Sequence, residues 1–131
     1  QIYRFLVDTQ KKEGDPEIEA IFTELEPQRL VIEKALEGLS TTCIHAVEIF
    51  ISIYGAEAGN LALKYLARGG VYLGGGLAPR LLPFFKHGGF MSAFTAKGRF
   101  SSLMQDIPIY LILEDTTALF GAAHYARIKT L

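Results

Sequence analysis

The longest hydrophobic pattern in the chain is helical and lies between Ser40 and about Arg68. Apolar side chains recur there every three or four residues, and further apolar residues form a second flank. A helix that is apolar on most sides is typical of the buried centre of a domain, so we expect a long central helix capped near Ser40. Because glycine costs a helix about 1 kcal/mol relative to alanine, Gly55 and Gly59 are expected to let a neighbouring element approach closely. The apolar positions are Ile44, Val47, Phe50, Ile51, Tyr54, Ala58, Leu61 and Tyr65, with Ile49, Ile53 and Leu63 on the second flank.

The first forty residues are more polar and predict three shorter helices. These helices span 2–12, 16 to about 25, and 27 to about 37. Asp15 is suited to cap the second helix, which Pro16 would begin, and Gly38 is suited to end the third. We interpret residues 1–40 as a solvated helical subdomain.

Two short apolar runs after the central helix predict β-strands. The first, at about 70–74, is β-branched and aromatic, and the second, at 107–113, is continuously apolar, as in a buried strand. Pro79 and Pro83 require a short or kinked helix after the first strand, and a last helix is expected over 118–129. The sequence therefore predicts an α/β fold, mostly helical, with two parallel strands joined by a right-handed crossover. Because two strands form a poor sheet, the rest of the sheet is expected from missing chain or from another molecule.

Three consecutive glycines, Gly74, Gly75 and Gly76, follow the first strand. Bare backbone N–H groups at the end of a strand are typical of turns that contact a phosphate or nucleotide. The run does not match a Walker loop, because no Gly-Lys-Ser/Thr follows, and it lacks the third glycine and the acidic residue of a dinucleotide fingerprint. From the residues alone, two interpretations stay open: a ligand contact, or a turn that needs a positive φ and nothing more.

The remaining polar residues suggest no catalytic centre. His45 and Glu48 lie one helical turn apart but lack a third partner, so a surface role is favoured over a metal or acid–base pair. Asp115 is favoured as the cap of the last helix over a catalytic carboxylate. Lys97 and Arg99 form a basic turn that we expect to be exposed, with an anion contact as the alternative. We predict no catalytic residue and no metal site in this chain.

Composition narrows the class of protein further. The 131 residues suit a single domain, 1–131, and half of them are hydrophobic. The single cysteine, Cys43, excludes an intramolecular disulfide and favours a reducing, cytoplasmic compartment. Residues 41–131 carry eight basic and five acidic side chains, which suits an anionic ligand but falls far short of a nucleic-acid footprint. No secretory signal or membrane span is expected, and the start at Gln1, already in helical pattern, suggests a piece of a longer chain.

A series of short motifs occurs in order along the chain. They are Ile2-Tyr3-Arg4, Gly59-Asn60-Leu61-Ala62-Leu63, Gly69-Gly70-Val71-Tyr72-Leu73-Gly74-Gly75-Gly76-Leu77-Ala78-Pro79-Arg80, Phe84-Phe85-Lys86, Gly89-Phe90, Ala93-Phe94, Lys97-Gly98-Arg99-Phe100 and Ile107-Pro108-Ile109-Tyr110. Together they resemble the C-terminal part of bacterial-type glucokinase, a member of the hexokinase and actin-like ATPase superfamily. The resemblance covers most of residues 41–131, and the first forty residues match only at their start. The glycine run alone would be unspecific, whereas the ordered series is specific.

The resemblance implies part of an actin-like ATPase domain with a ribonuclease H-like fold. Residues 1–40 would be its helical subdomain, and 41–131 its ATP-side α/β part. The parent enzyme would transfer the γ-phosphoryl group of ATP, with Mg²⁺, to the 6-hydroxyl of glucose. The glycine run resembles the adenosine-binding motif of the family. The residues that the resemblance places at the nucleotide are Gly74, Gly75, Gly76, Leu77, Ala78, Pro79 and Gly121.

The departures from the family pattern concern the chemistry itself. The phosphate loops, the catalytic Asp and the glucose ligands of the family do not occur in this sequence. We therefore expect the chain alone to form one wall of the ATP site and to lack glucokinase activity. ATP and glucose would be partners of the parent, without nucleic acid or membrane, and a cytoplasmic homodimer is expected because the incomplete sheet leaves an apolar edge. The alternative is a non-catalytic module that self-associates or binds a nucleotide.

Overall fold

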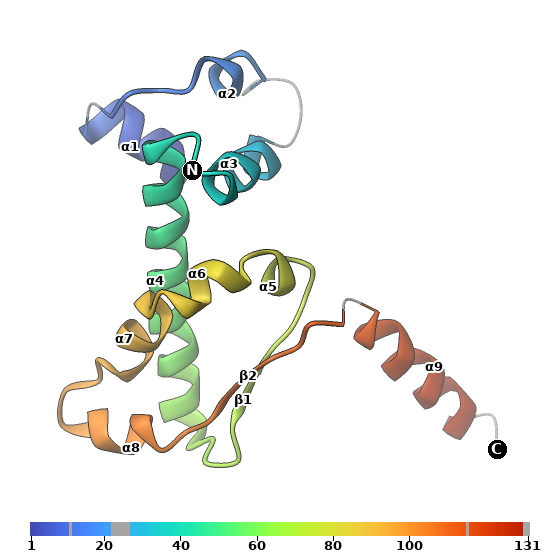
Figure 1. Cartoon of the computed structure of the whole chain (residues 1–131). Helices are drawn as coiled ribbons and strands as arrows, with labels where there is room; N and C mark the ends of the chain where they lie inside the picture. Colours follow the sequence, from blue (N-terminus) through green and yellow to red (C-terminus); the bar gives the residue numbers. More distant parts are fainter. Residues whose placement is uncertain (11, 22–26, 115, 130–131) are drawn as a thin grey trace.

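The computed structural model describes residues 1–10, 12–21, 27–114 and 116–129. The long helix α4 runs through the centre of the fold, and most other elements pack around it (Figure 1). Helices α1 and α3 pack at the N-terminal end of α4 and α2 packs on α3, while α6, α7 and α8 pack along the rest of α4. The fold is mostly helical with two parallel strands. In chain order the elements are α1 (Ile2–Gln10), α2 (Pro16–Ile21), α3 (Pro27–Leu36), α4 (Thr41–Tyr65), β1 (Val71–Leu73), α5 (Leu77–Arg80), α6 (Leu82–Lys86), α7 (Gly89–Thr95), the 3₁₀ turn Gly98–Phe100, α8 (Ser101–Gln105), β2 (Ile109–Leu111) and α9 (Thr117–Lys129).

Local side chains set the helix boundaries largely as predicted. The Ser40 hydroxyl accepts a hydrogen bond from the N–H of Cys43 (3.3 Å), which caps α4. Gly38 has a φ of +72° after α3, as expected of a helix stop. Helix α4 ends at Tyr65 rather than near Arg68, because Leu66 adopts the left-handed conformation (φ +48°) and turns the chain. The predicted end of α2 near residue 25 lies outside the described residues.

The two glycines of α4 allow α7 to lie directly on it, which confirms their predicted role. A Cβ atom on Gly55 would collide with the backbone carbonyl of Phe90, and one on Gly59 would lie 2.5 Å from the carbonyl oxygen of Phe94. Helix α7 therefore packs against the bare backbone of α4.

Lys97 fastens the end of α7 to the same face of α4. Its ammonium group donates to the carbonyl of Ala56 and to Oδ1 of Asn60, each at 2.8 Å. The side chain expected to be exposed is thus half-buried and serves as a structural link, while Arg99 is exposed with its guanidinium 5.0 Å from the Phe100 ring centre.

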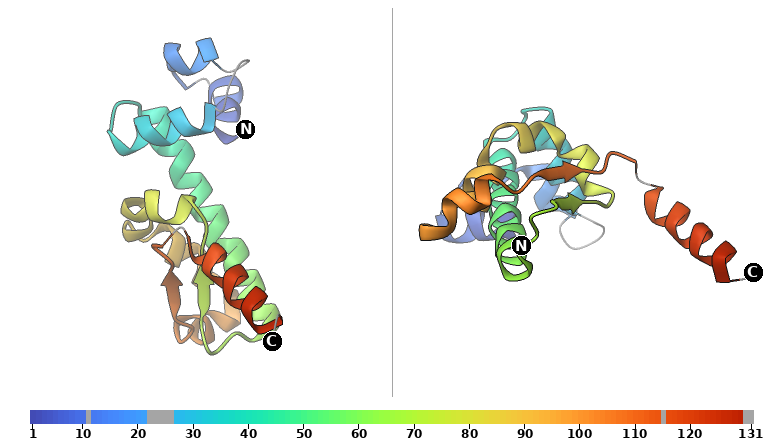
Figure 2. Two further views of the ribbon diagram at one scale, coloured as in Figure 1. Left: turned by 90° about the vertical axis from the view of Figure 1, so that its right-hand side faces the viewer. Right: turned by 90° about the horizontal axis from the view of Figure 1, so that it is seen from below.

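The strands β1 and β2 form a parallel pair with Tyr72 opposite Tyr110. Both strands are shorter than the predicted 70–74 and 107–113, because the ladder is confined to three residues on each side. Leu73 is buried toward the helices, whereas the Tyr72 and Tyr110 rings stack at 4.8 Å on the outer face and stay exposed. Figure 2 shows the strand pair beside α4.

The first forty residues share the core of the domain. Leu6 and Ile18 are fully buried, and Val31 and Ala35 pack with them against α4. The predicted solvated helices are therefore exposed on one side only, and their apolar sides cover the N-terminal half of α4.

Helix α4 also satisfies the length and composition of a membrane-crossing helix, with a mean hydropathy of 1.2 over its most apolar window, among the residues that the structure describes. Nine of its residues are buried inside the domain, under α1, α3 and α7. Its central position in the fold accounts for its apolar composition.

Helix α9 differs from every other long helix in its surroundings. It extends away from the domain after β2, and none of its residues is buried (Figures 1 and 2). Its large apolar side chains are exposed to the solvent. These are Leu119, Phe120, Tyr125 and Ile128.

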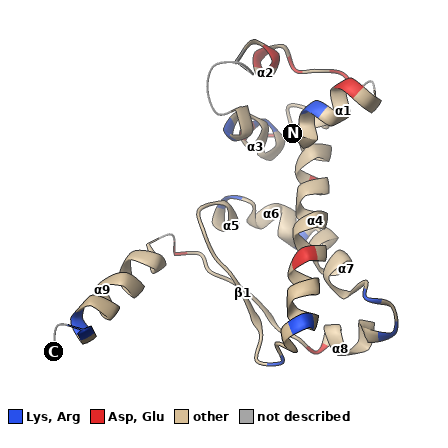
Figure 3. Ribbon diagram, turned by 180° about the vertical axis from the view of Figure 1, so that it is seen from behind, with Lys and Arg blue, Asp and Glu red and all other residues tan. Residues whose placement is uncertain are grey.

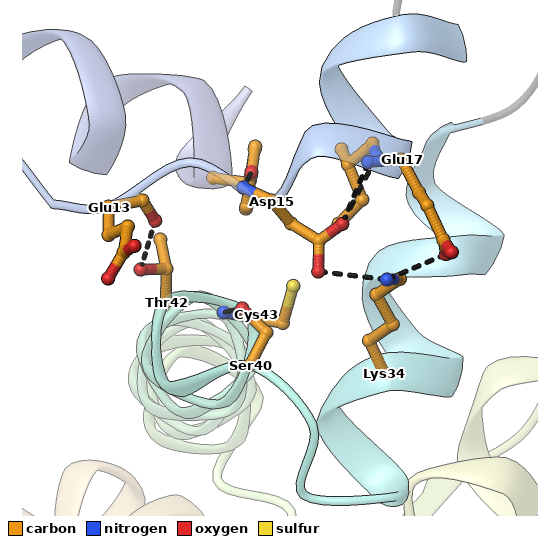
Figure 4. A network of polar contacts seen from close by, with 9 residues as sticks. Glu13, Asp15, Glu17, Lys34, Ser40, Thr42 and Cys43 are labelled. Atoms are coloured by element: carbon orange, nitrogen blue, oxygen red, sulfur yellow. Dashed lines mark hydrogen bonds and ion pairs between the residues drawn. The ribbon is translucent and has the colours of Figure 1, made fainter.

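A polar network ties α2 and α3 together near the start of α4 (Figure 4). The Lys34 ammonium lies 2.9 Å from the Asp15 carboxylate and 2.8 Å from that of Glu17. Burial alone would raise the pKa of Asp15, but hydrogen bonds from Lys34 and from the N–H groups of Ile18 and Glu17 lower it overall. The two carboxylates raise the pKa of Lys34. Asp15 is thus both the predicted cap of α2 and the ion-pair partner of α3.

Replacing Lys34 with methionine is expected to lower the melting temperature at neutral pH by removing the ion pair of Asp15. Since the pKa of Asp15 is lowered in the folded state, its contribution is present above the ordinary Asp pKa and is lost as the pH falls through the folded-state value. The difference in Tm between the wild type and Lys34→Met should therefore shrink as the pH is lowered below about 4. Thermal unfolding between about pH 3 and pH 7 measures it.

Arg29→Met is the matched control, because Arg29 pairs with Glu33 on the same helix at 2.8 Å with both side chains well exposed. Such surface pairs contribute little, so this variant should change Tm only slightly. A Lys34→Met effect that is independent of pH would contradict the role of the Asp15 carboxylate.

Candidate functional site

The three glycines after β1 form an exposed turn, the glycine turn Gly74–Gly76. Gly75 has a φ of +104°, which confirms that the turn needs a positive φ, and Gly76 directly precedes α5. A Cβ on Gly75 or Gly76 would meet nothing within 4 Å. Conformation rather than packing therefore explains Gly75, and no residue that the structure describes fills the space beside the turn.

The other residues predicted at the nucleotide have different surroundings. Leu77 is 47% exposed beside the turn, and Pro79 is half-buried. Ala78 is buried in the core, and its N–H donates to the carbonyl of Gly75 (3.2 Å), so it stabilises the turn from inside. The structure thus brings Leu77 and the glycine turn together on the surface and places Ala78 behind them.

Gly121 is not brought to the glycine turn in the same way. It lies on α9, where a Cβ would meet nothing within 4 Å. The resemblance places Gly121 at the nucleotide, and that contact stays a prediction.

An apolar cavity of about 410 Å³ begins at Leu77 and extends toward the N-terminal helices. Its size is within the range of small-molecule sites, which are lined mainly by apolar side chains with a few polar groups. Among its lining residues, Gln1 and Gln28 supply amide groups that can donate and accept hydrogen bonds. The cavity, which we call the apolar cavity, is lined by Gln1, Ile2, Tyr3, Pro27, Gln28, Val31, Ile32, Ala46, Val47, Phe50, Leu77 and Leu81.

Most of this lining was not predicted as part of a site. Ile2, Tyr3 and Val31 come from the helices that the sequence analysis interpreted as a solvated subdomain. Their apolar helical positions were the available signal, but no motif connected them with Leu77, which lies far along the chain.

The polar candidates named from the sequence do not assemble into a reactive cluster. His45 is half-buried and Glu48 is exposed, both on α4. Within the described ranges, no three His, Cys, Asp or Glu side chains are grouped so that they could hold a metal ion. The predicted cap Asp115 lies outside the described residues; next to it, the Glu114 carboxylate accepts hydrogen bonds from the N–H and hydroxyl of Thr116.

These observations define a class of structure: a mostly helical α/β unit in which a parallel strand ends in a glycine turn beside an apolar cavity. Comparison with known proteins gives the family. The family model described as Glucokinase matches residues 1–129, and the chain belongs to this family. The resemblance predicted from the motifs is thereby confirmed.

Individual relatives agree with the family model. The chain is 43% identical over 118 residues to a glucokinase of Synechocystis sp., covering 90% of this chain and 32% of that protein. It is 41% identical over 133 residues to a glucokinase of Nostoc punctiforme, with coverages of 93% and 39%, and 47% identical over 103 residues to one of Pectobacterium atrosepticum, with coverages of 79% and 32%.

A solved structure described as glucokinase from an Antarctic psychrotroph matches the fold. Its TM-score is 0.75 at 27% identity, and the match covers 93% of this chain and 35% of that chain. The chain therefore spans about a third of the length of the glucokinases that it matches.

Proposed function

We propose that this chain supplies the adenosine side of the ATP site of a glucokinase. The observation that carries the proposal is the position of Leu77, which borders the glycine turn and also lines the apolar cavity. A purine base is flat and largely apolar on its faces, so it suits a cavity lined mainly by apolar side chains with an amide at its edge. The exposed backbone at Gly75 and Gly76 would then face the ribose and the first phosphate.

The parent protein, on this proposal, is a cytoplasmic enzyme of glycolysis with an actin-like, ribonuclease H-like fold. It would transfer the γ-phosphoryl group of ATP to glucose, a reaction that depends mainly on positioning and on charge stabilisation. The described residues offer no acidic cluster for Mg²⁺.

The nucleotide site predicts a specific effect of Gly75→Val. The substitution places a branched side chain in the space beside the turn and strains a φ of +104°, so chemical-shift changes caused by ATP around Leu77 and the apolar cavity should be lost. Titration of the 131-residue chain with ATP, followed by two-dimensional NMR, measures this. Glucose alone should cause no change in the same spectrum, because the sugar ligands of the family do not occur in the sequence.

Gly88→Val is the matched control. Gly88 also has a positive φ (+86°) and would also meet nothing within 4 Å, but it lies after α6 and does not line the cavity. Both variants carry a similar backbone strain, and only Gly75→Val should lose the response to ATP. Equal responses of the two variants would remove the case for the glycine turn as a nucleotide contact.

The chain by itself is expected to produce no glucose 6-phosphate. Neither the sequence nor the described residues supply a general base beside a phosphate loop, so positioning of the γ-phosphoryl group is missing. A coupled assay with the purified chain, ATP, Mg²⁺ and glucose should stay at the level of a blank, with the complete Synechocystis glucokinase as the positive control. Activity above the blank would overturn this expectation.

Self-association is the second proposal for the isolated chain. Tyr72 and Tyr110 are exposed on the outer face of the strand pair, together with the apolar side chains of α9, and such surfaces favour association. Light scattering at high concentration tests for the homodimer predicted from the sequence.

A further inference from the structure

The apolar cavity offers few side-chain groups that can form a hydrogen bond with a ligand. Of the described residues that line it, only Gln1, Tyr3 and Gln28 carry polar side-chain atoms. Charged residues occur on α1, α2 and α3, as Figure 3 shows, but none of them is among the described residues that line the cavity. The cavity therefore suits an uncharged part of a ligand, whose polar atoms meet three side chains at most.

The hydroxyl group of Tyr3 is already bound to another part of the protein. Tyr3 is buried, and its hydroxyl oxygen accepts a hydrogen bond from the N–H of Asp15 (2.6 Å). The carboxylate of the same Asp15 pairs with Lys34, so this hydroxyl belongs to the polar network between α2 and α3. The amides of Gln1 and Gln28 are therefore the side-chain groups that remain for recognising a ligand in the cavity.

Gln28 is held in place more firmly than Gln1. It lies in the first turn of α3, and Val31 of the same helix is buried and lines the same cavity. The ion pairs of Lys34 hold α3 against α2. Gln1, in contrast, precedes α1 and lies outside any helix. Gln28 is itself exposed, so a rigid helix presents its amide at the rim of the cavity.

The two ends of the cavity lie on different elements. Leu77, beside the glycine turn, belongs to α5, whereas Gln28 belongs to α3, nearer the N-terminal end of α4 (Figure 1). With the ribose at the glycine turn, as proposed above, a purine base extends from Leu77 toward α3. Position 6 of a purine lies on the side of the base remote from the ribose. A glutamine amide pairs with adenine there, because it accepts from the 6-amino group and donates to N7.

We propose that Gln28 recognises the 6-amino group of adenine and sets the preference of the site for ATP over purine nucleotides that lack this group. The inference rests on the proposed function and names the residue that reads the base. The apolar lining contacts the faces of any purine, so the preference depends on the amide. A neutral hydrogen bond at an exposed rim changes affinity several-fold, because water replaces a lost partner.

The test compares ATP with purine riboside 5′-triphosphate, which differs from ATP only in lacking the 6-amino group. Two-dimensional NMR titrations of the 131-residue chain give the two dissociation constants. The wild type should bind ATP about five- to tenfold more tightly than the purine nucleotide. Gln28→Leu keeps the size of the side chain and removes the amide, so it should bind the two nucleotides equally. A purely structural role of Gln28 would weaken both nucleotides together and leave their ratio unchanged.

Gln1→Leu is the matched control, because it makes the same chemical change at the other amide of the cavity. It should keep the preference of the wild type for ATP. Equal binding of the two nucleotides by the wild type, an unchanged preference in Gln28→Leu, or a preference lost in Gln1→Leu would overturn the inference. In each of these cases ATP still binds, so the proposed function stands. Absence of a response to either nucleotide would contradict the proposed function and, with it, the role of Gln28.

Discussion

Replacing Gly55 by alanine is expected to lower the free energy of unfolding by about 3 kcal/mol. The new methyl group would collide with the carbonyl of Phe90 and would lie 2.9 Å and 3.0 Å from its carbonyl carbon and Cα, so the obstacle is backbone that cannot rotate away. Helix α7 would have to move off α4. The gain in helix propensity from glycine to alanine is about 1 kcal/mol and does not offset this cost. Urea denaturation followed by circular dichroism measures the change.

Gly69→Ala is the control for this experiment. Gly69 is exposed after α4, and a Cβ there would meet nothing within 4 Å, so its replacement should change stability by less than about 0.5 kcal/mol. Gly59→Ala should resemble Gly55→Ala, because its Cβ would lie 2.5 Å from the carbonyl oxygen of Phe94. If Gly55→Ala proved as stable as Gly69→Ala, the close packing of α7 on α4 would be refuted.

The same two glycines show how far sequence reasoning reached in this fold. Glycine inside an apolar helix lowers the stability of that helix, and a close contact with another element explains why it is there. The contact could therefore be predicted. Its partners, Phe90 and Phe94, lie more than thirty residues away and could not, since helical spacing contains no information about which element packs where. The charged side chain of Lys97 was misplaced for the same reason, because its acceptors lie on α4.

Turns and strands depend on local chemistry, and they were predicted well. The positive φ of Gly75 and the breaks around Pro79 and Pro83 follow from the intrinsic backbone preferences of glycine and proline, which do not depend on distant contacts. The predicted strands were too long, because a strand extends only as far as the neighbouring strand forms backbone hydrogen bonds with it. That limit is set by the tertiary structure.

Of the candidate site, the glycine turn was predicted from the sequence and the apolar cavity was not. The glycine turn is a contiguous motif, and the ordered series of motifs around it is specific enough to indicate the family from the sequence alone. The apolar cavity is assembled by α1, α3, α4 and Leu77, and no single stretch of sequence contains it. Such a site can be identified only when the packing of α1 and α3 against α4 is known.

Replacing Phe94 by alanine is expected to have the largest effect on stability, about 3–5 kcal/mol. Phe94 is fully buried, and its ring stacks on Phe90 at 6.1 Å between ring centres, while Phe90 packs edge-on against Tyr54 of α4. Truncation would leave a cavity in the contact that joins α7 to α4, and backbone already in contact at Gly59 limits how far the helices can close over it.

A loss of this size is comparable with the whole stability of many domains, so Phe94→Ala is expected to be largely unfolded at about 37 °C and to lose its response to ATP, although Phe94 does not line the apolar cavity. Phe100→Ala is the control: that ring is 39% exposed, and its removal should cost less than about 1 kcal/mol. Thermal and urea unfolding of both variants compare the two positions. Equal stabilities would mean that the aromatic contact between α4 and α7 does not hold the domain together, whereas the expected difference would show that the fold around the glycine turn depends on a helix pair on which none of the predicted site residues lies.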